Sequence, residues 1–271
     1  MSTLLNALNE CGFVVKEIEA IKNGVNCKGY QIDNGTNIKP VIYHSPEESI
    51  EAFVARAIEI AKSPVPQIDV EKITSHEYLL DNTFVCLQKK GNEEICKRTF
   101  LDLEMYVRIG VDFADGTSGS IKVTQGILEK AGMSEDRLYE AAIQNSEKKA
   151  HVTSMAETLG MMTEELFGEN LFYVATYHDK AHGAGIMAVT KILHEFCEKK
   201  GYGKIYILPS STEEVLFIPN GYMDPESLAV MVNCVNEETV DPKLQLNPTV
   251  YLYDDNLGAV TIAFSYNKKC R

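Results

Sequence analysis

The chain has 271 residues, of which 45% are apolar, and a formal net charge of −13 at neutral pH. This length allows one large domain or two modest ones, and the apolar fraction excludes a disordered chain. No apolar run reaches the ~18 residues of a membrane helix, and the N-terminus lacks the basic start and apolar run of a signal peptide. We therefore expect a cytoplasmic protein that does not enter a membrane.

The cysteine spacing and the distribution of charge indicate which kinds of binding site to expect. The seven cysteines form no C-x-x-C pair, a pattern typical of reduced, buried thiols and not of a zinc site. Acidic residues occur along the whole chain, with nine acids against four bases in residues 129–170. Binding to a nucleic-acid backbone requires clustered Lys and Arg, so direct nucleic-acid binding is disfavoured.

Residues 1–66 are predicted to form a β-meander and a helix. The pairs Asn23-Gly24 and Asn34-Gly35 separate three strand-like runs, and Asn-Gly accepts the positive φ of a two-residue hairpin turn. Pro40 cannot donate a ladder hydrogen bond, so the third strand is predicted to lie at an edge.

A helix is predicted to follow the meander. Ser45 is its expected cap, with Pro46 at the first helical position and Glu48 completing a capping box. Apolar residues then recur every three or four positions, which predicts one stripe packed on the meander. The stripe comprises Ile50, Phe53, Val54, Ala57, Ile58 and Ala61. The segment Ser63-Pro64-Val65-Pro66 ends the helix.

Residues 67–150 are predicted to form antiparallel strands followed by two helices. Strand-like runs cover Ile73–Leu80 and Thr83–Leu87, and apolar residues alternate from Leu101 to Phe113. Asp115-Gly116 predicts a hairpin into the next strand. Two helical segments follow, QGILEKAG and SEDRLYEAAIQNSEKKA, the second capped by Ser134.

Residues 151–271 are predicted to form a mixed α/β half, either a separate part or continuous with what precedes it. Residues 146–170 favour a partly helical connection, with Met155, Met161 and Met162 as core filler. Strand and helix signals then alternate, and Asp224-Pro225 is a clear helix start. Hairpins mixed with helices predict an α+β fold.

The segment YHDKAHGAG, residues 177–185, holds the most suggestive polar residues. His178 and His182 are four apart, but Gly183 and Gly185 interrupt the helix that a two-histidine metal site would need. We therefore predict no metal site. No nucleophile elbow accompanies the serines that follow.

The same segment is similar to the pyrophosphate loop of the acetyl-coenzyme A acetyltransferases. Lys180, Gly183 and Gly185 follow a predicted strand and precede a predicted helix, where backbone N–H groups can hold an anion. This similarity implies the alternative function of an acetyltransferase-like enzyme that binds acetyl-CoA at residues 180–185.

Over most of its length the chain resembles a bacterial family of unknown function, domain of unknown function 5688. The resemblance runs through KNGVNCKGYQIDNGTNIKPVIY, RTFLDLEMYVRI, GAGIMAVTKIL and YILPSSTEEVLFIP to the final VYLYD. It implies a protein of anaerobic gram-positive bacteria, their phages or their conjugative elements. The family usually has Asn or Lys at His178 and a His at Glu213 or Glu214, so neither His178 nor His182 is implied as a shared catalytic residue.

The sequence therefore predicts a non-enzymatic factor without a cofactor that binds another protein. The resemblance and the acidic composition are compatible with an inhibitor of host defence or an acidic mimic of nucleic acid, although such a composition is more typical of an ordinary soluble surface. A housekeeping or structural protein is a third alternative. On the mimicry hypothesis, the interaction surface comprises Glu135, Asp136, Glu164 and Glu165.

Overall fold

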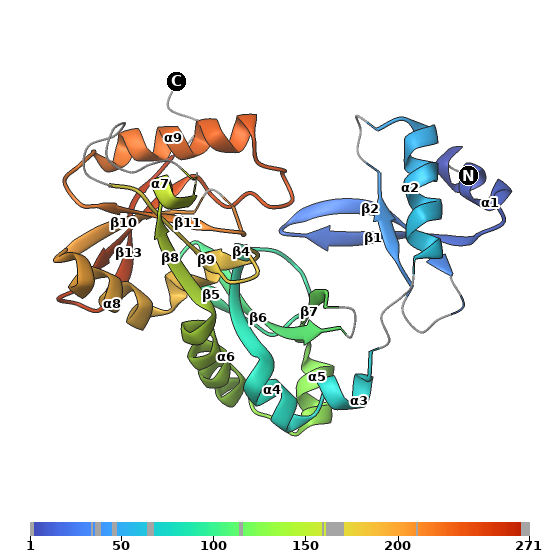
Figure 1. The fold of residues 1–271 in the computed structure, drawn as a ribbon, viewed down its shortest axis with the longest axis horizontal. Helices are drawn as coiled ribbons and strands as arrows, with labels where there is room; N and C mark the ends of the chain where they lie inside the picture. Colours follow the sequence, from blue (N-terminus) through green and yellow to red (C-terminus); the bar gives the residue numbers. More distant parts are fainter. Residues whose placement is uncertain are drawn as a thin grey trace. The chain divides into compact units, whose positions relative to one another are not determined.

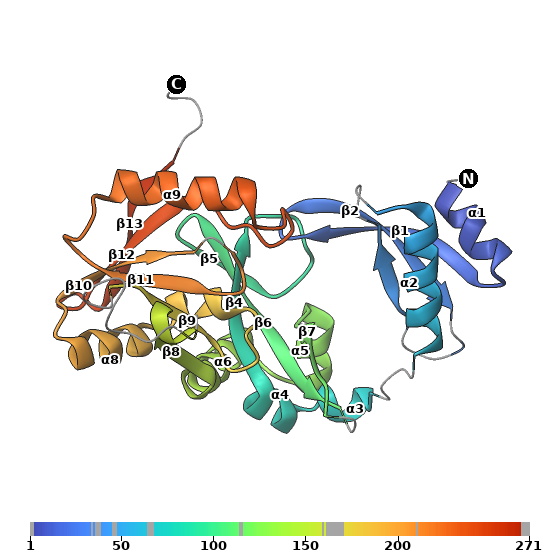
Figure 2. The same ribbon diagram turned by 45° about the horizontal axis from the view of Figure 1, so that its top comes forward.

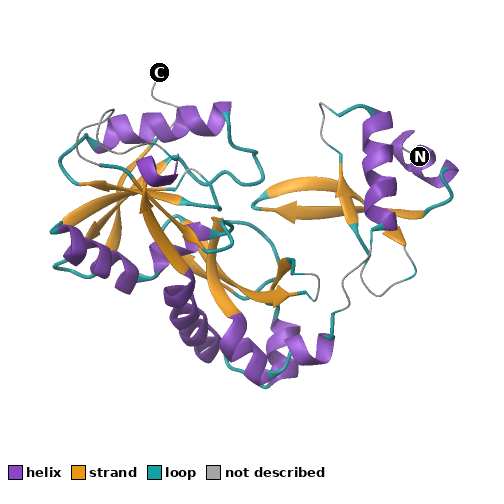
Figure 3. Cartoon of the chain, viewed as in Figure 1, coloured by secondary structure: helices purple, strands orange, loops and turns teal. Residues whose placement is uncertain are grey.

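A computed structural model describes residues 3–33, 35, 39–44, 48–63, 68–113, 116–158, 160, 171–209 and 211–266. The chain divides into two compact units, Met1–Ile68 and Asp69–Arg271. Helices occur among antiparallel strands in both units (Figure 3), which confirms the predicted α+β class. None of the helices within the described ranges is long and apolar enough to cross a bilayer.

The first unit is an antiparallel meander with two helices. Its elements are α1 (Thr3–Glu10), β1 (Val14–Lys22), β2 (Val25–Asp33), β3 (Val41–Tyr43) and α2 (Ile50–Lys62). Asn23 and Gly24 form the first turn with φ values of 49° and 76°, as predicted. The strand order β1-β2-β3 places β3 at an edge, also as predicted. Asn34 lies outside the described residues, and Gly35 has a φ of 74°.

Helix α2 starts later than predicted. Its cap is Ser49, whose side chain accepts a hydrogen bond from the Ala52 N–H at 3.2 Å. The Glu48 carboxylate pairs with the Arg56 guanidinium at 2.7 Å. The expected cap residues Ser45 and Pro46, and the segment 64–67, lie outside the described residues.

Four residues of the predicted stripe pack on the meander, whereas Ile50 is exposed and Ile58 does not belong to the packed cluster. Phe53 and Ala57 are fully buried in a cluster with Tyr30, Ile32 and Ile42. Helix α1, which was not predicted, adds its Leu8 to this cluster. One apolar core therefore holds the first unit together.

The second unit begins with helices and a four-stranded sheet. Its first elements are α3 (Val70–Ile73), α4 (His76–Asn82), β4 (Thr83–Lys89), β5 (Lys97–Phe100), β6 (Leu103–Asp112), β7 (Ser118–Lys122), α5 (Gln125–Ala131) and α6 (Glu135–Lys149). The strands follow the order β4-β6-β5, and β7 pairs with β6. The Ser134 cap of α6 and the hairpin at Gly116 agree with the prediction, whereas Asp115 lies outside the described residues.

Two predictions for this region were wrong. Ile73–Leu80 is not a strand, because Asp69 and Ser75 each accept a hydrogen bond from a backbone N–H and cap α3 and α4. The alternating strand begins at Leu103 and not at Leu101, because Leu101 has a φ of 54° in the turn that joins β5 to β6.

The rest of the second unit is a six-stranded antiparallel sheet with helices. Its elements are β8 (Ala150–Ser154), α7 (Met155–Thr158), β9 (Tyr173–Tyr177), the 3₁₀ helix η1 (Gly183–Ala188), α8 (Thr190–Lys200), β10 (Lys204–Leu208), β11 (Val215–Pro219), α9 (Pro225–Glu238), β12 (Thr249–Asp254) and β13 (Ala259–Ser265). The strand order is β13-β12-β10-β11-β9-β8. Alternate residues of β10 pack toward α8 and α9, so these helices cover opposite faces (Figures 1 and 2).

Here the sequence predicted the strands from β9 onward and the Asp224 cap of α9, but it missed β8. The supposed connecting segment after residue 146 completes α6 and then forms this strand, which pairs with β9 along its whole length. The helix expected from Gly185 to Lys200 divides into η1 and α8 at Val189. Met161 and Met162 lie outside the described residues.

The two sheets of the second unit are joined at Val85, on the β4 edge opposite β6. The Val85 carbonyl accepts a hydrogen bond from the Tyr177 hydroxyl at 2.9 Å, and its N–H donates to the Ser146 hydroxyl at 3.0 Å. A Cβ at Gly185 would lie only 2.0 Å from the Val85 carbonyl oxygen. Gly183 is equally confined, because its Cβ would lie 2.5 Å from the Thr176 Cα. Both glycines are therefore required by close backbone packing.

We expect Gly185→Ala to destabilise the second unit by about 3 kcal/mol, because the added methyl group forces η1 away from β4. Urea unfolding followed by circular dichroism measures this change. The matched control is Gly203→Ala, since a Cβ there meets nothing within 4 Å. Equal stabilities of the two variants would contradict the packing argument.

Candidate functional site

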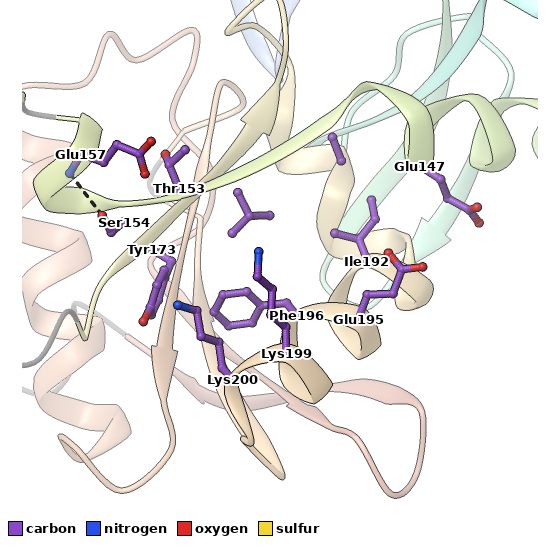
Figure 4. Close-up of a pocket in the computed structure, with 12 residues that line it drawn as sticks. Glu147, Thr153, Ser154, Glu157, Tyr173, Ile192, Glu195, Phe196, Lys199 and Lys200 are labelled. Carbon is purple, nitrogen blue, oxygen red and sulfur yellow. Dashed lines mark hydrogen bonds between the residues drawn. The ribbon is translucent and has the colours of Figure 1, made fainter.

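A pocket of about 390 Å³ opens between strand β8 and helix α8 (Figure 4). We call it the β8–α8 groove. Its lining comprises Glu147, Ala150, Val152, Thr153, Ser154, Glu157, Tyr173, Ile192, Glu195, Phe196, Lys199 and Lys200. The residues come from α6, β8, α7, β9 and α8, so the groove exists only in the folded second unit.

The floor of the groove is apolar. Val152 lies on β8, and Ile192 and Phe196 project from α8, where both are buried. The Phe196 ring meets the Tyr173 ring edge-on, with 5.0 Å between their centroids. This aromatic contact fixes the distance between the sheet and the helix and keeps the floor in place.

Strand β8 is the last strand of the sheet and forms one wall of the groove. Two hydrogen bonds at the ends of β8 show which of its backbone groups point toward β9. The His178 N–H donates to the Lys149 carbonyl, and the Met155 N–H donates to the Phe172 carbonyl. By alternation, the N–H and C=O of Val152 point away from β9, toward the open edge. No described strand pairs with that edge.

Other parts of the chain limit the length of this open edge. The Ala150 N–H donates to the Ser146 carbonyl at the end of α6. At the other end, the Ser154 carbonyl accepts a hydrogen bond from the Thr158 hydroxyl at 3.0 Å. The accessible backbone therefore centres on Val152.

Charged residues surround the apolar floor. Figure 4 shows Lys199 directed toward the middle of the groove and Lys200 toward Tyr173, whereas Glu147 and Glu195 lie together at the opposite end. The Lys200 Nζ lies 4.5 Å from the centroid of the Tyr173 ring. Outside the groove, Lys191 pairs with Glu147 at 2.6 Å, which neutralises one of the two acids.

The two histidines singled out in the sequence lie in different surroundings. His178 is exposed after β9, with its ring 5.6 Å from that of His151. His182 adopts a φ of 60° at the start of η1, and its Nδ1 lies 3.9 Å from a Glu213 carboxylate oxygen. The described residues contain no group of three or more His, Cys, Asp or Glu side chains that could hold a metal ion.

The glycines of the same segment lie where their amides are already used. The Gly183 N–H donates to the Glu213 carbonyl at 2.9 Å, the Ala184 N–H to the Thr212 carbonyl at 3.1 Å, and the Gly185 N–H to the His182 carbonyl at 3.2 Å. Residues 183–185 are buried, while Lys180 is exposed. These three amides are therefore not available to a pyrophosphate group.

Two of the four acidic residues proposed as an interaction surface lie in the described part of the chain. Glu135 and Asp136 both pair with the Arg98 guanidinium, at 2.9 and 2.6 Å, in the first turn of α6. This position also suits the helix dipole. Glu164 and Glu165 lie outside the described residues.

Sequence reasoning missed the groove, because its parts are far apart in the chain. Val152 and Tyr173 lie 21 residues apart in the chain. Lys199 and Lys200 lie at the end of a helix, where basic residues are common. The short β-favouring run AHVTS was the available signal for β8.

The family comparison agrees with the resemblance seen in the sequence. The model of a family of unknown function (DUF5688) matches residues 5–255. The chain belongs to this family. No curated protein matches the chain, and no solved structure matches it.

His182 makes the stability of this DUF5688 protein depend on pH. Burial, with the positive charges of Arg108 and Lys122, lowers its pKa to about 4 from the usual 6.5. The unfolded chain therefore binds more protons between these values, and the folded state loses stability as the pH falls through this window.

We expect wild-type protein to lose about 2 kcal/mol more stability than His182→Gln between pH 6.5 and pH 4.5, because only the wild type must protonate this imidazole on unfolding. Urea unfolding at both pH values measures the difference, and the carboxylates common to both proteins cancel. Equal losses in the two proteins would show that His182 titrates normally.

Proposed function

We propose that the protein is a non-enzymatic binding factor that holds an extended segment of another protein in the β8–α8 groove. The observation that carries this proposal is the open backbone edge at Val152, directly beside a pocket with an apolar floor. An edge strand next to a helix can accept a peptide as an additional strand.

Backbone hydrogen bonds and side-chain contacts would contribute differently to binding. The Val152 N–H and C=O would form main-chain hydrogen bonds with the bound segment, which gives affinity independent of sequence. Alternate side chains of that segment would point toward α8 and cover Ile192 and Phe196, which gives selectivity. Because the open edge is short, the segment needs only about three residues in register with β8.

Acetyl-CoA binding, mimicry of nucleic acid and action on a host machine have less support in the geometry of the chain. Acetyl-CoA binding at residues 180–185 would need amides that already have intramolecular acceptors. Mimicry of nucleic acid would draw on Glu135 and Asp136, which Arg98 partly neutralises. Action on a host machine, for a phage or another mobile element, is compatible with the groove and rests on the family resemblance alone.

The test uses a phage-displayed library of random ten-residue peptides, panned on the full-length protein. We expect enriched peptides whose binding, measured by fluorescence anisotropy, falls at least tenfold in Val152→Pro. Proline removes the N–H that faces the open edge, and an edge position tolerates it structurally. Val152→Thr is the matched control, because it keeps both the N–H and the β-branched shape.

A thermal unfolding curve close to that of the wild type confirms that Val152→Pro folds. Failure of the library to enrich any peptide would contradict the proposal. Enriched peptides that bind wild type and Val152→Pro equally would contradict it as well.

A further inference from the structure

Two lysines of the groove have no acidic partner among the described residues. Lys199 and Lys200 are exposed at the end of α8, and neither forms an ion pair there. The neighbouring Lys191 does form one, with Glu147. Glu157 also lines the groove on the side of Tyr173, but it forms no ion pair with either lysine, so two positive charges face one carboxylate at this end.

We propose that the segment bound in the β8–α8 groove carries an Asp or Glu side chain that pairs with Lys199 and Lys200. This inference rests on the proposed function and adds the chemistry of the partner. Figure 4 supports it, because Lys199 points into the groove and Lys200 lies along Tyr173, both on the side of α8 that faces β8.

The opposite end of the groove sets the direction of the bound segment. Glu195 lies there without an ion pair in the described part of the chain, beside Glu147. Because Lys191 neutralises Glu147, the unpaired Glu195 would repel a carboxylate at that end, whereas Lys199 and Lys200 would attract one at the other end. The segment therefore enters with its acidic residue toward Lys199 and Lys200.

The spacing between groove floor and lysines predicts a short pattern. Side chains on one face of a strand recur every second residue, about 7 Å apart. An apolar side chain over Val152 and Phe196 is then followed or preceded, two positions away, by the acidic one. The pattern is apolar, any residue, acidic, in the order that places the acid at the lysine end.

The experiment repeats the peptide selection with two forms of the full-length protein. We expect peptides selected on wild type to contain the pattern and to bind at least tenfold more weakly to Lys199→Glu/Lys200→Glu. The matched control, Lys90→Glu/Lys130→Glu, changes the net charge equally at exposed lysines outside the groove and should bind as wild type. Peptides in which Lys replaces the acidic residue should bind the groove variant better than wild type.

Outcomes separate this inference from the proposed function. Loss of binding in Val152→Pro with unchanged binding in Lys199→Glu/Lys200→Glu would overturn the acidic pattern and leave strand addition standing. Equal losses in the groove variant and the control would also overturn it, since net charge alone would then explain the effect. Loss confined to the groove variant, and weaker binding at high salt, supports it.

Discussion

The second unit depends on the approach of η1 to the free edge of β4. At that point Gly185 touches the Val85 carbonyl more closely than any side chain allows. The unmatched backbone groups of Val85 are satisfied by the hydroxyls of Tyr177 and Ser146 and not by another strand. Two sheets with separate strand orders thereby share one continuous core. The position of β9, and with it that of β8 and the groove, follows from this junction.

The junction also explains the residues that stand out in the sequence between 177 and 185. Glycines before a helix are often interpreted as an anion cradle, but here their missing side chains allow backbone to contact backbone. Tyr177 reaches into the core, and His182 is held neutral beside Arg108 and Lys122. The glycines and Tyr177 of this segment therefore hold the two sheets of the second unit together.

The structural features that the sequence predicts correctly depend on residues that are close together in the chain. The Asn23-Gly24 turn and the caps at Ser134 and Asp224 act within a few residues, so the sequence alone identifies them. Asp69 and Ser75 are caps of the same kind, but the apolar residues after them also fit a strand. β8 was missed because its stability comes from pairing with β9, which begins only at Tyr173. The groove could not be predicted at all, since it requires the packing of Phe196 on Tyr173.

The short open edge of β8 has a consequence for the behaviour of the protein at high concentration. Exposed sheet edges are sites where identical chains stack into fibrils, and proteins protect themselves by shortening or blocking them. Here the end of α6 occupies the Ala150 N–H, and Thr158 engages the Ser154 carbonyl. The β8 edge therefore has room for a short segment but not for a full-length strand of a second copy. At this edge, the blocked ends limit stacking of identical chains.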